Sequence, residues 1–262
     1  MRNPVTQGLW PALDHSAPGI RLAIPEFMKL KPDHKTVLVR DMTVFRNLRD
    51  FLVSDGYKVV YETPRVGEEK TGMATSAFHH PYTNERIAMV YGIDAPDEVS
   101  QGQAPFKFGF DGKPQAEAQT YIQHLALRTP DIFRFREYME KKGAQFLTPI
   151  FQDKDSFGPL LQCFSREILD DEWFFFEFLQ RDYDADKIGT KSGVQFVDKT
   201  VRSLYVTKQD EFRDWMKTHK KKTFLGELPK AKARDVFHEI IDNVDPKGYP
   251  LTVWAIAKAY RQ

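Results

Sequence analysis

The 262-residue chain contains a single cysteine, Cys163. That count excludes an internal disulfide framework and any zinc or iron–sulfur site built from several cysteines. The sequence also lacks any run close to the roughly 20 apolar residues that cross a bilayer. Its start, MRNPVTQGLWPALDH, has no apolar core of signal-peptide length. We therefore expect a soluble, cytoplasmic protein with no membrane partner.

An excess of charge of one sign is also missing. The 38 basic and 37 acidic residues leave a formal net charge of +1, so no nucleic-acid partner is expected. The basic run at residues 219–222 has acids nearby and is interpreted as a solvated helix end. What is present is a globular composition, with 41% hydrophobic and 13% aromatic residues. Its 21 phenylalanines indicate a large aromatic core or an aromatic-lined pocket.

The chain divides into three parts. Residues 1–32 are rich in proline and are interpreted as an N-terminal arm; residues 183–262, mainly helical over 208–242, form a C-terminal lid and helical extension. Residues 33–182 form a paired domain, and the pattern of each half predicts a strand, a helix and three strands. The expected elements are residues 36–39, 44–52, 57–62, 72–78 and 86–91, then 122–127, 133–142, 145–148, 160–164 and 173–179.

A weak internal repeat supports this pairing. Aligning DHKTVLVRDM with QHLALRTPDI places His34 on His124, and each histidine lies seven residues before an aspartate. After the helix of each half, Gly56 falls near Gly143, and Asp131 is a candidate helix N-cap. We therefore predict an α+β fold of two tandem βαβββ modules with a helical C-terminal extension.

The segment WFFFEFLQR, residues 173–181, places one carboxylate among aromatic residues. Both faces of the predicted strand are apolar, which is typical of a strand buried on both sides. Burying an unpartnered carboxylate is costly, so Glu177 needs a cation, a network of hydrogen-bond donors or a proton. Arg181 lies on the same side of the strand and is the alternative, purely structural partner.

Two histidines at repeat-equivalent positions change the interpretation of Glu177. In a pseudo-symmetric pair of modules, the first strands face one shared cavity, so His34, His124 and Glu177 would meet as a facial triad. Two imidazoles and one carboxylate leave coordination positions open and suit Fe(II). The alternative is that the histidines are hydrogen-bonded core residues. His79 and His80 compete as ligands, but adjacent strand residues point in opposite directions, so a turn beside the following proline is the better interpretation.

Residues 122–182 resemble the catalytic half of the 4-hydroxyphenylpyruvate dioxygenases, within the vicinal-oxygen-chelate superfamily. The matching stretches are QHLALRTPDI, KKGAQFL, GPLLQCF and FFFEFLQR. The resemblance implies that the two βαβββ modules form a half-open barrel around a metal. It also implies that His124 and Glu177, with His34, are the iron ligands. It further implies that Gln123 and Gln162 orient the substrate and that Phe164 and Phe196 pack against it. Phe196 lies in a segment that resembles the family's gating lid.

The chain departs from that family in three places. It has only about thirty residues before the first module, where the family usually carries a further domain of similar fold. The stretch GMATSAFHHPYTNERIAMVYG has no clear match to the family's substrate-facing polar residues, and the region after about residue 205 is not family-like. The resemblance therefore supports the metal and the class of chemistry better than it supports the family's substrate.

The resemblance implies a non-haem Fe(II) dioxygenase that oxidatively decarboxylates and hydroxylates a 2-oxo acid, arylpyruvate-like in its side chain. Its partners would be that acid and O2, and assembly into a homo-oligomer is left open. The alternatives are an extradiol ring-cleaving dioxygenase, a non-oxidative isomerase or lyase of the same superfamily, and a metal-free binding protein on the same scaffold. A structural protein that docks another chain through its C-terminal helices is a further alternative.

Overall fold

The computed structural model describes residues 24–109, 118–168, 172–188, 191, 193 and 195–245. The expected N-terminal arm as far as residue 23, and the segment after residue 245, lie outside this part of the chain. Within it, the order of elements in each half is the predicted strand, helix and three strands. The α+β fold with two βαβββ modules is therefore confirmed.

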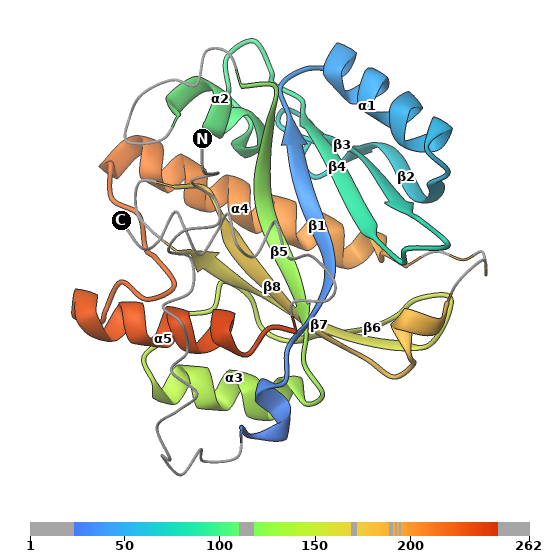
Figure 1. Cartoon of the computed structure of the whole chain (residues 1–262). Coiled ribbons are helices and arrows are strands. Elements are labelled where there is room, and N and C mark those ends of the chain that lie inside the picture. Colours follow the sequence, from blue (N-terminus) through green and yellow to red (C-terminus); the bar gives the residue numbers. More distant parts are fainter. Residues whose placement is uncertain are drawn as a thin grey trace, which may run out of the picture.

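A single eight-stranded sheet joins the two modules in the order β2-β3-β4-β1-β5-β8-β7-β6 (Figure 1). The central strands β1 and β5 pair antiparallel, while β1 pairs parallel with β4 and β5 pairs parallel with β8. The first module consists of β1 Lys31–Val39, α1 Met42–Ser54, β2 Lys58–Val66, β3 Met73–His79 and β4 Arg86–Gly92. The second consists of β5 Thr120–Arg128, α3 Ile132–Lys141, β6 Phe151–Lys154, β7 Pro159–Glu167 and β8 Phe175–Arg181.

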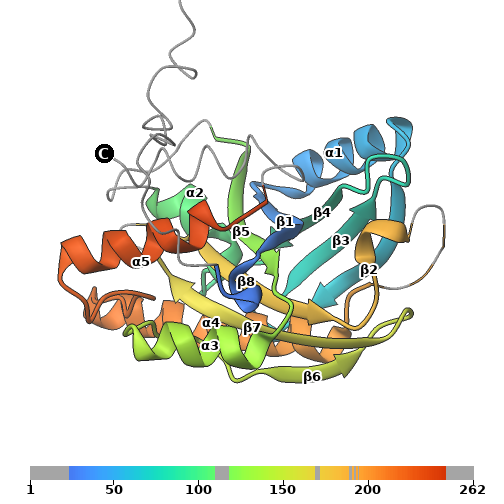
Figure 2. The ribbon, with the colours of Figure 1, turned by 60° about the horizontal axis from the view of Figure 1, so that its bottom comes forward.

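The remaining elements lie before, between and after the modules. They are η1 Glu26–Met28, η2 Gln101–Gln103, α2 Ala104–Phe108, η3 Ala185–Lys187, α4 Asp198–Thr218 and α5 Lys230–Asp242. Figure 2 shows α3 and α5 running alongside the second module and α1 on the first. In the described residues, no helix combines the length and the apolar character needed to cross a membrane.

Equivalent residues begin and end the helix of each module. The Asp41 carboxylate accepts a hydrogen bond from the backbone N–H of Val44 at the start of α1, and Asp131 caps α3 in the same way. Both helices end before a glycine with positive φ, 97° at Gly56 and 96° at Gly143. This left-handed conformation favours glycine because a Cβ atom would be strained there. The repeat seen in the sequence is thus a repeat of capping signals.

Strand β8 is buried on both faces, as its sequence predicts. Phe174, Phe176 and Phe178 pack on one side with residues of α3 and α5. Phe175, on the opposite side, packs in a second cluster that includes residues of α4. The helix α4 therefore covers the face of the sheet opposite to α3 and α5, which is the face that carries Glu177.

Two expected elements lie elsewhere. The strand predicted at residues 145–148 is only a single bridge, Phe146 to Ser165, and the edge strand β6 begins at Phe151. The segment does not form a regular strand because its backbone N–H groups bond to two different parts of the chain. Gln145 N–H donates to Phe224 O, and Leu147 N–H donates to Phe164 O. The helical region predicted for residues 208–242 is two helices, and the first begins ten residues earlier, at Asp198.

Candidate metal centre

One extra residue in each central strand shapes the centre of the barrel. In the β1–β5 ladder, His34 lies opposite Ala126 and His124 lies opposite Thr36. The register shifts by one residue just outside these pairs, so Asp33 and Gln123 form β-bulges directly before the two histidines. A bulge re-aims a side chain that regular alternation would turn away. Asp33 and Gln123 are accordingly buried together with the histidines they precede.

The two histidines meet Glu177 at one point. His34 Nε2 lies 3.2 Å from Glu177 Oε2, and His124 Nε2 lies 3.4 Å from the same oxygen. One ligand atom from each residue lies within 4.8 Å of the others, so the three could hold one metal ion. All three are at least 95% buried, with exposed fractions of 2%, 4% and 4%. The sequence therefore predicted correctly which three side chains come together.

A small residue between the strands makes this convergence possible. Ala126 on β5 lies opposite His34 on β1 and also opposite Glu177 on β8, so the three residues form one row across the sheet. Ala126 is fully buried. Its methyl group leaves space above the central strand, into which the longer side chains from both neighbours lean.

The electrostatics of the site reflect a carboxylate held by imidazoles. Burial raises the pKa of Glu177, but the neighbouring His34 and His124 outweigh it and lower that pKa to about 2. Burial lowers the pKa of His34, but Glu177 and Asp33 outweigh it and raise the value to about 9. For His124, burial prevails and the pKa lies below its usual value. Glu177 is therefore ionised at neutral pH, and His34 is the histidine that carries the proton.

A buried ionic network fixes the ring of His34. Its Nδ1 lies 2.9 Å from Asp33 Oδ1, and the guanidinium of Arg181 holds both oxygens of Asp33 at 3.0 Å. Arg181 also donates to Asp155, at 2.6 Å, and to the hydroxyl of Tyr183. The proposed structural pairing of Arg181 with Glu177 is therefore wrong, because Arg181 is committed to Asp33 and Asp155. A carboxylate on Nδ1 sets the tautomer that leaves Nε2 free to bind a metal.

The second histidine has different surroundings. The Nδ1 atom of His124 is buried and has no hydrogen-bond partner within the described chain. Its ring packs against aromatic side chains, with centroids 4.8 Å from Phe175 and 6.3 Å from Phe164. His124 is thus held mainly by packing, whereas His34 is held by charge.

The expected substrate-pocket residues lie around the triad. Phe164 is directly opposite Glu177 in the β7–β8 ladder, and Gln162 is opposite Leu179, two residues further along. The ring of Phe196 lies 5.0 Å from that of His34.

Gln123 is held by a single hydrogen bond. Its Nε2 donates to Gln101 Oε1 at 3.2 Å, while its own Oε1 is buried without a partner among the described residues. That oxygen is an acceptor available to a bound molecule.

His79 and His80 form no second centre. The Nε2 atom of His79 is 2.9 Å from Asn84 Oδ1, and the ring of His80 accepts a hydrogen bond from the backbone of Thr83. These contacts belong to the turn between β3 and β4, which is the interpretation the sequence favoured.

Several residues near the centre were not predicted. Asp33 could have been found from the repeat alignment, where it precedes His34 as Gln123 precedes His124. Gln101, and Tyr205 and Lys208 on α4, carry no comparable signal. Polar residues on the buried face of an amphipathic helix cannot be told from surface residues without the fold.

Solved structures resemble this chain in fold. A triple mutant of 4-hydroxymandelate synthase from Streptomyces coelicolor has a TM-score of 0.55 at 17% identity, covering 70% of this chain and 54% of that one. The chain therefore spans about half the length of that enzyme. Methylmalonyl-CoA epimerase from Mycobacterium tuberculosis gives a TM-score of 0.39 at 16% identity, over 58% of this chain and 88% of that one.

A xylose isomerase-like TIM barrel/4-hydroxyphenylpyruvate dioxygenase fusion protein gives a TM-score of 0.42 at 14% identity, over 68% of this chain and 29% of the other. No family model matches the chain. No curated protein matches it. The likeness is one of fold, and it agrees with the tandem modules and the His, His and Glu cluster of a vicinal-oxygen-chelate fold.

Proposed function

We propose that this protein is a non-haem Fe(II)-dependent dioxygenase acting on a 2-oxo acid with an arylpyruvate-like side chain. The observation that carries the proposal is the convergence of His34, His124 and Glu177 on one buried point. Two imidazoles and a single carboxylate are the ligand set of non-haem Fe(II) oxygenases, which leaves positions open for substrate and O2.

The donor set fits a divalent cation. Within the described chain, the ion pairs of Glu177 are with His34 and His124, and Arg181, the nearest candidate in sequence, binds elsewhere. Both Nε2 atoms point at the same carboxylate oxygen, so a metal would replace one proton and satisfy all three groups. The Asp33 carboxylate on His34 Nδ1 is the kind of outer contact that accompanies metal-bound histidines.

The bound iron would supply activation of O2 and a chelation point for the 2-oxo acid. Each turnover would consume one O2 and release one CO2, placing one oxygen atom in the new carboxylate and the other in a hydroxyl group. The chain's own residues would position the substrate: Gln123 through its unpartnered Oε1, and Gln162 from β7. Phe164 and Phe196 would pack against its side chain.

The aromatic surroundings suit this chemistry because they exclude water from a reactive centre. Phe164, Phe175 and Phe196 surround the two imidazole rings. On this proposal residues 33–182 are the metal-binding domain, and residues 183–262 supply the lid, with α4 covering the inner face of the sheet.

Anaerobic reconstitution with Fe(II), followed by a panel of 2-oxo acids, tests the proposal. We expect one iron per chain and a weak visible charge-transfer band when a 2-oxo acid chelates it. Admitting O2 should then give equal amounts of O2 consumed and CO2 released.

Three results contradict the proposal. Ring opening of a catechol without CO2 release indicates an extradiol enzyme. Turnover without O2 indicates an isomerase or lyase. Absence of any bound transition metal after anaerobic purification indicates a binding protein.

A further inference from the structure

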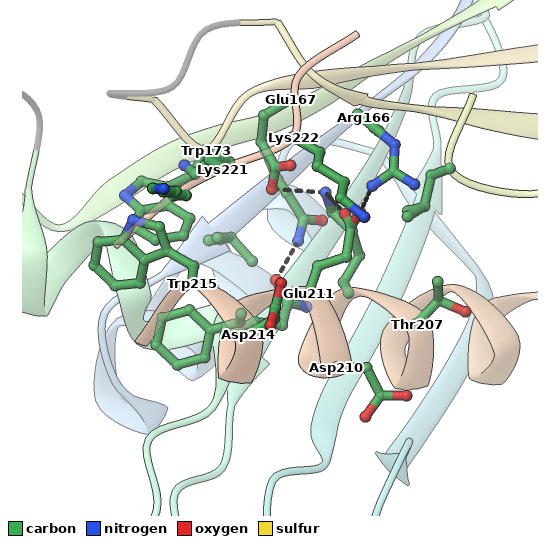
Figure 3. A pocket seen from close by; sticks show the side chains of 17 residues that line it. Arg166, Glu167, Trp173, Thr207, Asp210, Glu211, Asp214, Trp215, Lys221 and Lys222 are labelled. Atoms are coloured by element: carbon green, nitrogen blue, oxygen red, sulfur yellow. Dashed lines mark hydrogen bonds and ion pairs between the residues drawn. The ribbon is translucent and has the colours of Figure 1, made fainter. Parts of the chain in front are cut away.

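A cavity of about 310 Å³ lies between α4 and the ends of β7 and β8 (Figure 3). Its most buried lining residues include Leu38, Gln123 and Phe212, and the exposed Lys220 and Lys222 lie at its mouth. Gln123 directly precedes His124 in β5. The cavity therefore reaches to within one residue of the candidate metal centre.

Lys208, on α4, lines this cavity and lies near the metal centre. Its side chain is only 2% exposed, and its Nζ lies 2.6 Å from Glu167 Oε1. The same ammonium lies 4.4 Å from the ring centroid of Phe175, which in turn is 4.8 Å from that of His124. The sum of these two distances places the ammonium within about 9 Å of the His124 ring. A molecule bound at the metal could thus extend to Lys208.

Charged groups of both signs meet in the wall of the cavity. Arg166 pairs with Glu211, and Lys208 lies 3.8 Å from Glu211 in addition to its pair with Glu167. Burial raises the pKa of Glu167, but Lys208 and Lys221 outweigh it and hold that pKa below its usual value. Although it lies beside these two carboxylates, the buried Nζ of Lys208 has no hydrogen-bond acceptor among the described residues.

The mouth of the cavity adds no further net charge. Asp210 and Asp214 on α4 face the same opening as Lys220 and Lys222, and all four side chains are exposed. A preference for an anion must therefore come from the wall, where Lys208 lacks a hydrogen-bond acceptor in the described part of the chain.

Stability does not explain this cluster. A buried ionic cluster is at best neutral for stability compared with well-packed apolar residues. An entering anion would give the Lys208 ammonium a hydrogen-bond acceptor, and Glu167 would retain Lys221 if the ammonium turned away. The arrangement therefore accepts a negative charge without leaving a carboxylate unpaired.

We propose that this cavity is the distal arm of the substrate site, and that Lys208 selects 2-oxo acids carrying a second anionic group at the far end of the side chain. The inference rests on the proposed function, because the 2-oxo acid end must bind the metal. The aromatic walls suit a planar spacer between the two acids. The rings of Trp173 and Trp215 lie 5.0 Å apart, and that of Phe212 is 5.7 Å from each.

Calorimetric binding to the Zn(II)-loaded protein tests the inference without turnover, because zinc is redox-inert. The two ligands are 4-carboxyphenylpyruvate and phenylpyruvate, which differ by one distal carboxylate. We expect the first to bind about tenfold more tightly or better, the effect of one buried charge-assisted contact. Equal affinities overturn the distal arm while leaving the proposed function intact. Failure of both ligands to bind in a metal-dependent way contradicts the proposed function itself.

Substitutions assign the preference to Lys208. Lys208→Met keeps the length of the side chain and removes its charge, so it should abolish the preference while phenylpyruvate binds as it does to wild type. Lys208→Arg should keep the preference, which provides a test if the methionine variant does not fold. Lys217→Met is the matched control, because Lys217 is exposed on α4 and does not line the cavity, and it should behave as wild type. A preference that persists in a folded Lys208→Met protein overturns the role of this residue.

Discussion

Glu177 and Ala88 occupy equivalent positions in the two modules. Glu177 on β8 lies opposite Ala126, and Ala126 follows His124 by two residues in β5. Ala88 on β4 lies opposite Thr36, and Thr36 follows His34 by two residues in β1. The sheet thus offers two related places for a carboxylate, and only one is used. Ala88 packs instead in a small apolar cluster against which Phe196 rests. The two modules therefore form one candidate metal centre, with a histidine from each half and the acid from the second.

Removing a ligand should separate metal binding from folding. We expect His124→Ala and Glu177→Ala to abolish stoichiometric Fe(II) binding under anaerobic conditions, because two donors do not hold the ion. Circular dichroism should show that both variants fold, since the triad is a minor part of the buried surface. Iron affinity unchanged in both folded variants would remove the assignment.

Enlarging the residue between the ligands should also disturb the centre. Ala126→Leu would place a branched side chain where the side chains of His34 and Glu177 converge, so we expect metal affinity to fall by at least about tenfold. The matched control is Ala77→Leu, because Ala77, on β3, is fully buried as Ala126 is. It should cost about 1–3 kcal/mol of unfolding free energy, as overpacking does, without changing metal affinity. Equal losses of affinity in both variants would contradict the geometry.

The Asp33 carboxylate, which contacts Nδ1 of His34, should strengthen metal binding. We expect Asp33→Asn to lower Fe(II) or Co(II) affinity about 10- to 100-fold, because the amide cannot stabilise the bound imidazole as a carboxylate does. Asp155→Asn alters the same Arg181 network without touching His34 and should change affinity much less. Titration of both purified variants with Co(II), followed by its visible spectrum, measures the difference. Matching affinities would show that Asp33 acts only through Arg181.

Metal affinity should rise with pH. Burial lowers the pKa of His34, but Glu177 and Asp33 outweigh it and raise the value to about 9, so this ring is protonated at neutral pH without metal. Glu177 is already ionised and the pKa of His124 is lowered, so one proton must leave as the ion binds. Apparent Co(II) affinity should therefore increase about tenfold per pH unit between pH 6 and 8. A flat profile would mean that no proton is displaced.

Much of the fold could be predicted from local signals. The N-caps at Asp41 and Asp131 and the glycines at 56 and 143 act over a few residues, so their effect is visible in sequence. The phenylalanines around Glu177 likewise identify a strand buried on both faces. These features locate the triad because the duplicated modules place equivalent strands side by side.

The remaining features depend on long-range pairing. The bulges at Asp33 and Gln123 arise from the register between β1 and β5, which no single strand encodes. Arg181 was the alternative partner for Glu177, but its guanidinium reaches Asp33, 148 positions away in the chain. The segment at 145–148 has strand-like residues, yet its backbone bonds are divided between the chain near Phe164 and Phe224. Sequence patterns therefore predict the residues of the candidate metal centre, whereas the residues that contact them depend on the strand register.

The central claim is that one ferrous ion binds between the two modules. Crystals grown anaerobically with Fe(II) and measured at the iron absorption edge would locate it directly. We expect a single strong anomalous peak bonded to the Nε2 atoms of His34 and His124 and to a carboxylate oxygen of Glu177. A peak at any other position, or none at saturating Fe(II), would contradict it.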